Sequence, residues 1–142
     1  MSISEEWKTD SFIDNTHPER YLLSIARLHS KYSEWLRNET EAYRKASRDF
    51  DKLHNEVLQD YEKGPANRKE IKGWDKPARG TNASRFIVDS YVAANPEILK
   101  AKEKIDFHEA NVDELQRIIK AIHSMGYDIR TYLDYKKFLA GV

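Results

Sequence analysis

The stretch PERYLLSIARLHSKYSEWLRNETEAYRKASRDFDKLHNEVLQDYE, residues 18–62, decides the fold class. It contains no glycine and no proline after Pro18, and its apolar residues recur every three or four positions, as on one face of a helix. Pro18 suits the first position of a helix. The N-cap would be either Thr16, which has capping-box spacing to Glu19, or His17. Because globular helices usually span roughly 8–20 residues, the pattern predicts one long helix over 18–62 in a coiled coil or bundle.

A second long helix is predicted over residues 96–125. Asn95 is a good N-cap and Pro96 a good first residue. Two columns of mostly apolar residues then repeat every seven positions, which is typical of a coiled-coil seam. Since so apolar a face is rarely left exposed, we expect it to pack between subunits. The residues of this predicted oligomerisation seam are Ile98, Ile105, Val112, Leu115, Ile119 and Ile122.

Glycines should end the helices near the carboxyl terminus. Gly126 is predicted to stop the heptad helix, because glycine is the usual residue just after a helix. Asp128 would then cap a short final helix over 128–140, and Gly141 would end it.

The two remaining segments are predicted to be a polar leader (1–17) and a long basic loop (63–95). Residues 63–85 hold three Gly and two Pro, with seven basic side chains against two acidic ones, a net charge of +5. Phe86–Val92 is a short apolar patch that fits either one strand or one helical turn.

Basic residues beside an aromatic ring suit single-stranded nucleic acid, because cations bind phosphates and rings stack on bases. A solubilising flexible loop is an equally good interpretation of the same segment, and Trp74 could equally anchor the loop on the helices. The candidate DNA-binding residues of the loop are Lys63, Arg68, Lys69, Lys72, Trp74, Lys76 and Arg79.

The long helix carries its own basic stripe, in which Arg44, Arg48 and Lys52 are spaced by four and so share a face. These three are further candidate DNA-binding residues. Acidic residues are interspersed among them, so a salt-bridged, solvent-exposed face is the competing interpretation.

Composition excludes several function classes. The chain has 142 residues, a net charge of zero, 34% charged residues and no cysteine, which removes disulfides, thiolate metal sites and cysteine nucleophiles. No phosphate-binding loop, dinucleotide motif, zinc-protease motif or nucleophile elbow occurs, and the five histidines suit no metal site. We therefore expect a protein that is not an enzyme and uses no cofactor or metal. No membrane span or signal peptide is evident, so a cytosolic location is expected.

Several segments in order resemble the UvsY family, the recombination mediators of T-even-like bacteriophages. They include SFID (11–14), YSEWL (32–36), PEILKAKEKIDF (96–107) and the tail SMGYDIRTYLDYKKFLAG (124–141), and the similarity covers about residues 8–61 and 96–141. The stretch LHNEVLQDY (53–61) departs from the family, which has a basic run there, so no DNA contact is transferred residue by residue.

The resemblance implies an all-α, helix-loop-helix fold that assembles into a ring-like homo-oligomer, a hexamer or heptamer. It implies single-stranded DNA binding and help in loading a RecA-like recombinase onto strands covered by the phage single-stranded DNA-binding protein. These activities would serve phage recombination, repair and replication in the cytoplasm of the infected bacterial host. The alternative is a helical oligomeric scaffold or adaptor that never binds DNA.

Overall fold

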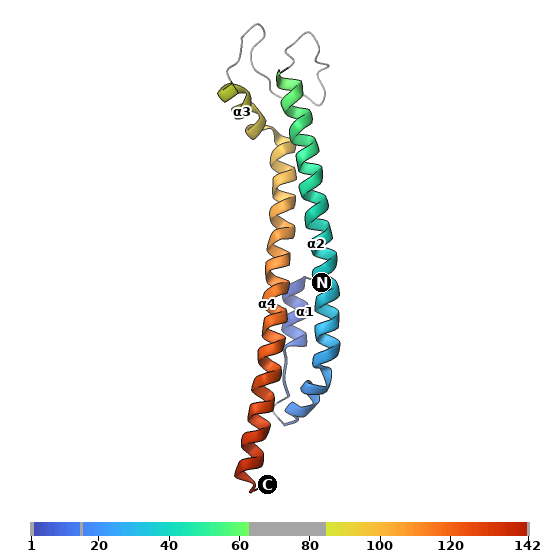
Figure 1. Cartoon of the computed structure of the whole chain (residues 1–142), viewed down its shortest axis with the longest axis vertical. Helices are drawn as coiled ribbons and strands as arrows, with labels where there is room; N and C mark the ends of the chain where they lie inside the picture. The colour runs from blue at the N-terminus through green and yellow to red at the C-terminus, as the bar shows by residue number, and fades with distance from the viewer. Residues whose placement is uncertain (1, 15, 63–84, 142) are drawn as a thin grey trace. The chain divides into compact units, whose positions relative to one another are not determined.

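The computed structural model describes residues 2–14, 16–62 and 85–141. Within these ranges the chain forms four helices and no strand, so the predicted all-α class is confirmed. The helices are α1 (Ile3–Asp10), α2 (Pro18–Glu62), α3 (Arg85–Ala94) and α4 (Pro96–Leu139), in the order that Figure 1 shows. α2 has the bounds predicted for the first long helix.

Three predicted boundaries are wrong. The leader is not irregular, because Ser2 and Glu5 form a capping box that starts α1. Residues 85–94 of the predicted loop form α3, which decides the Phe86–Val92 patch in favour of helix. The heptad helix does not end at Gly126 but continues to Leu139 as one helix, so no separate helix over 128–140 exists.

The continuity of α4 through Gly126 has a packing reason. A mid-helix glycine costs only about 1 kcal/mol relative to alanine, and beyond it Ile129 is buried and Leu133 packs against the same core. Burying such side chains is worth more than the glycine costs. Gly141 is the glycine that follows the helix end, with a φ of 73°, as predicted.

The chain divides into two compact units. Unit 1 comprises residues 1–40 and 109–142 and holds α1, the start of α2 and the end of α4. Its core takes residues from all three helices, at spacings of three, four or seven along each long helix. The buried residues are Ile3, Tyr21, Leu28, Tyr32, Leu115, Ile118, Ile122 and Ile129.

Unit 2 comprises residues 41–108 and holds the end of α2, α3 and the start of α4. Its core is smaller and consists of Val57, Tyr61, Val88, Val92 and Ile98, with several half-buried apolar residues around them. None of the helices in the described ranges is long and apolar enough to cross a membrane.

Asn95 joins the three helices of unit 2. Its Oδ1 accepts hydrogen bonds from the backbone N–H of Glu97 (2.9 Å) and Ile98 (3.3 Å), which confirms the predicted N-cap of α4. Its Nδ2 donates to the Tyr61 hydroxyl of α2 at 2.9 Å. Asn95 is only 2% exposed, so this polar side chain fixes the α3–α4 corner against α2.

Candidate nucleic-acid interface

The basic stripe of α2 lies in unit 2 and is open to solvent. Arg44, Arg48 and Lys52 are all exposed, and their spacing of four places them along one face of the helix over about 12 Å. The neighbouring acids Glu41, Asp49 and Asp51 are exposed as well.

Among the described residues, none of the three stripe cations forms an ion pair. The structure therefore does not support the salt-bridged interpretation of the stripe. Exposed guanidinium and ammonium groups without a protein partner can bind phosphate groups directly, because no ion pair within the protein has to be broken first. The geometry is that of a row of cations which a polyanion could follow.

The other candidate DNA-binding residues lie outside the described residues, so their two interpretations stay open. They are Lys63, Arg68, Lys69, Lys72, Trp74, Lys76 and Arg79.

The predicted oligomerisation seam is largely used inside the chain. Leu115 and Ile122 have no exposed surface and belong to the core of unit 1, while Ile98 is 4% exposed and belongs to the core of unit 2. These three residues are therefore already buried within the chain, and contact between subunits through them stays a prediction. Their apolar periodicity serves packing within the chain, and the remaining seam residues, Ile105, Val112 and Ile119, are half-buried.

The part of α4 after the predicted seam carries an exposed apolar surface. No binding surface was predicted there from the sequence. Five aromatic or aliphatic residues in this part of the helix are 44–77% exposed, with charged residues among them. Their aromatic content gives this surface considerable area to bury. The residues of this apolar tail are Tyr127, Tyr132, Tyr135, Phe138 and Leu139.

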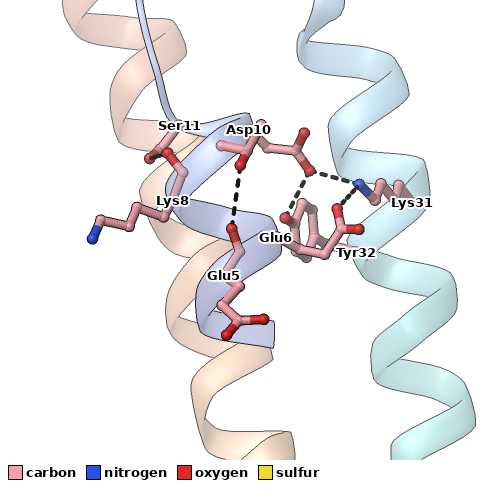
Figure 2. A network of polar contacts seen from close by, with 8 residues as sticks. Glu5, Glu6, Lys8, Asp10, Ser11, Lys31 and Tyr32 are labelled. Atoms are coloured by element: carbon pink, nitrogen blue, oxygen red, sulfur yellow. Dashed lines mark hydrogen bonds and ion pairs between the residues drawn. The ribbon is translucent and has the colours of Figure 1, made fainter. Parts of the chain in front are cut away.

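An ionic clamp, also not foreseen from the sequence, fastens α1 to α2 (Figure 2). Asp10 Oδ2 accepts from Lys31 Nζ at 2.7 Å and from the Tyr32 hydroxyl at 2.8 Å. Lys31 Nζ also donates to Glu6 Oε2 at 2.7 Å. Glu6 and Asp10 are four residues apart on α1, so one face of this short helix presents both carboxylates.

The clamp shifts the pKa values of Asp10, Lys31 and Tyr32. Burial opposes ionisation of Asp10, but hydrogen bonds from Lys31 and Tyr32 outweigh it and lower the pKa of Asp10 below its ordinary value. The hydrogen bond to Asp10, and then that to Glu6, raises the pKa of Lys31. Burial, and then the hydrogen bond to Asp10, raises the pKa of Tyr32. Asp10 is therefore ionised and Lys31 protonated across the neutral range, and the two form an ion pair that joins α1 to α2.

No group of three or more metal-ligating side chains occurs among the residues that the structure describes. Histidines from α2 and α4 do meet in unit 1, where the rings of His29 and His123 lie edge to face with centroids 5.2 Å apart. Two rings in this arrangement make a packing contact and do not amount to a metal site.

Comparison with solved structures finds the same fold. One crystal structure of the bacteriophage T4 recombination mediator protein UvsY, in lattice type II, has a TM-score of 0.79 and 21% identity and covers 99% of this chain and 98% of that one. Another, in lattice type IV, has a TM-score of 0.77 and 19% identity and covers 96% and 94%. At these identities the likeness concerns the fold alone. A comparison with curated proteins gave no match.

The sequence itself carries the family assignment. A family model described as "Recombination, repair and ssDNA binding protein UvsY" matches residues 6–142, which is nearly the whole chain. The match includes α2, α4 and the basic stripe between residues 44 and 52. The chain therefore belongs to the UvsY family of recombination, repair and single-stranded DNA-binding proteins.

Proposed function

We propose that this chain is a recombination mediator that binds single-stranded DNA and helps load a RecA-like recombinase onto strands covered by the phage single-stranded DNA-binding protein. The observation that carries the proposal is the row of exposed cations Arg44, Arg48 and Lys52, which form no ion pair with the residues that the structure describes, in a chain of this family. The basic residues and Trp74 of the 63–79 segment are proposed to extend the same binding surface.

The physical basis of binding would be the release of counterions from the DNA backbone. Each phosphate that a Lys or Arg neutralises releases condensed cations, so affinity falls with salt and depends little on base sequence. Three cations on one subunit give only a modest surface. Repetition of that surface around a homo-oligomer would raise the affinity through effective concentration, since a strand held by one subunit is close to the next.

We propose that the oligomer, a hexameric or heptameric ring, is held by the apolar tail of α4 together with Ile105, Val112 and Ile119. Exposed apolar patches rimmed by charge commonly mark protein–protein contacts. Replacing Tyr135 and Phe138 with Asp should give smaller species in native mass measurements, and an Ile105→Asp, Val112→Asp double variant should do the same.

An Arg130→Asp, Lys137→Asp double variant is the matched control, because it places two aspartates at exposed, polar positions of α4. It should keep the native mass of the unmodified protein. If both apolar double variants also keep that mass, the proposed assembly surface is wrong.

The loading activity is tested with a RecA-like phage recombinase, its cognate single-stranded DNA-binding protein and a long single strand. The recombinase ATPase should be suppressed when the strand is covered and should recover when this protein is added. A variant with Arg44, Arg48 and Lys52 changed to Gln should restore much less ATPase activity. Recovery without any measurable affinity for bare DNA would instead support a scaffold that acts through proteins alone.

A further inference from the structure

Unit 2 contains a groove of about 390 Å³ between its three helices, distinct from the basic stripe. Each helix contributes residues spaced by three or four, so each presents one face. Phe50 and His54 come from α2, Asp89 and Val92 from α3, and Leu99 and Lys102 from α4. The groove volume lies within the range of roughly 300–1,000 Å³ that is common for small-molecule sites.

Two rings of α2 form one wall of this groove. Phe50 and His54 lie one helical turn apart, with ring centroids 5.9 Å apart and planes inclined by 32°. Both side chains are half-buried, so the rings keep an accessible surface while their other contacts fix them. Phe50 packs against the core of unit 2, and the buried Val92 and Ile98 support the groove from below.

The opposite side of the groove supplies a cation and an apolar edge. Lys102 is exposed, and Leu99, one turn before it on α4, is 48% exposed. Asp89, on the α3 side, is also exposed, and its negative charge disfavours a phosphate there. A ligand with one phosphate and one flat ring would therefore place the phosphate at Lys102 and the ring against Phe50 and His54.

We propose that this groove receives one nucleotide of a bound single strand, whose base stacks on Phe50 and His54 while its phosphate contacts Lys102. The inference rests on the proposed single-stranded DNA binding and adds a base contact to it. Stacking on aromatic rings is tolerant of sequence because every base has a flat face.

The groove and the basic stripe face different directions. Phe50 and His54 each lie two positions after a stripe residue, Arg48 and Lys52 respectively, which is about 200° around α2. The two contacts should therefore be independent. Neutralising the basic stripe would change how DNA affinity depends on salt concentration. Removing the ring of Phe50 or His54 would instead change how much affinity depends on the presence of bases in the strand.

The test measures binding of a labelled oligothymidylate and of an oligonucleotide of equal length made of abasic sites. Phe50→Leu keeps an apolar side chain but removes the ring. It should weaken binding to oligothymidylate at least about fivefold and leave binding to the abasic strand unchanged. Phe107→Leu is the matched control, since Phe107 is an aromatic residue of unit 2 that is 62% exposed and does not line the groove. It should change neither affinity.

An equal loss on both strands, or no loss on either, would overturn the base contact while leaving the proposed DNA binding intact. If the unmodified protein binds neither strand, the proposed function itself fails. A second measurement uses unmodified protein and an oligonucleotide that carries the photoreactive base 5-iododeoxyuridine. Cross-links should map to the peptides that contain Phe50 or His54, and cross-links confined to other peptides would contradict the proposal.

Discussion

In unit 1, residues of the short helix α1 pack with residues of α2 and α4 in a core where Tyr32, with no exposed surface, contacts two tryptophans. The Tyr32 ring is 5.6 Å from that of Trp7 and 5.9 Å from that of Trp35. In unit 2, the short helix α3 packs on a smaller core that includes the buried Tyr61. The described surface of this unit also holds the basic stripe of α2 and an open groove.

The difference shows how one pair of long helices can serve two purposes. In unit 1 the charges Glu6, Asp10 and Lys31 are used to hold the chain's own helices together, so they are unavailable to a ligand. In unit 2 the described cations Arg44, Arg48 and Lys52 make no such contacts and remain free to bind. Unit 1 also has exposed cations, among them Arg117, Lys120 and Arg130, so the proposed DNA surface of unit 2 rests on the row that its three cations form along α2.

The largest expected effect is on the stability of unit 1. Tyr32→Ala removes a fully buried aromatic side chain and should lower the free energy of unfolding by about 3–5 kcal/mol, as large-to-small core substitutions of this size do. Phe12→Ala, at a position of unit 1 that is 77% exposed, should change it by less than about 0.5 kcal/mol. Urea denaturation measures both. Similar losses for the two variants would contradict the core assigned to unit 1.

The corner of unit 2 should show a smaller effect. Asn95→Ala removes the acceptor for two backbone N–H groups of α4 and the donor to Tyr61, and should cost about 1–2 kcal/mol. Asn55→Ala, on the exposed side of α2, is the matched control and should be near neutral. If thermal unfolding shows no difference between these two variants, Asn95 does not fix the α3–α4 corner.

The clamp of unit 1 should give a modest dependence of stability on pH. Because folding lowers the pKa of Asp10 from its ordinary 3.8, its contribution is present above that value and is lost as the pH falls through the folded-state pKa. Because folding raises the pKa of Lys31, its contribution is lost only above its ordinary 10.5, as the pH rises through the folded-state pKa. Between these limits the clamp is complete.

Asp10→Asn should therefore cost about 1 kcal/mol at pH 7 and less at pH 3, where the unmodified protein has also begun to lose the clamp. Asp134→Asn, on the exposed end of α4, serves as the control. Chemical denaturation at the two pH values measures the difference. A cost for Asp10→Asn that is the same at both values would show that the clamp is not electrostatic.

Much of this fold follows from local sequence signals. The range 18–62 contains no helix-breaking residue after its first position, and Asn95-Pro96 is a clear helix start, so both long helices were predictable. The prediction that the second long helix ends at Gly126 was wrong. A glycine favours a helix end locally, but packing against residues distant in the sequence favoured a longer helix. Ile129 is buried in the core of unit 1 and Leu133 packs against that core, and a helix that stopped earlier would lose this packing.

Other features depend on contacts that local patterns do not contain. The heptad columns included Leu115 and Ile122 but not the buried Ile118, and they did not distinguish packing within the chain from packing between subunits. The clamp joins residues that are 21–25 positions apart in the sequence. Its only sequence signal was the spacing of four between the acidic residues Glu6 and Asp10, in a segment that also holds apolar residues. The groove combines residues from three helices and becomes visible only when they are placed in space.

We propose that the cations of unit 2, and not those of unit 1, bind single-stranded DNA. The most direct test compares two charge-matched triple variants in salt titrations of oligonucleotide binding. In one, Arg44, Arg48 and Lys52 become Gln, and in the other the exposed Arg117, Lys120 and Arg130 of unit 1 do so.

Since each phosphate contact on a single strand adds about 0.7 to the slope of log affinity against log salt, the first variant should flatten that slope by about 2 per engaged subunit. The second variant should leave the slope of the unmodified protein unchanged. Equal flattening in both variants, or flattening in the unit 1 variant alone, would contradict the assignment of DNA binding to unit 2.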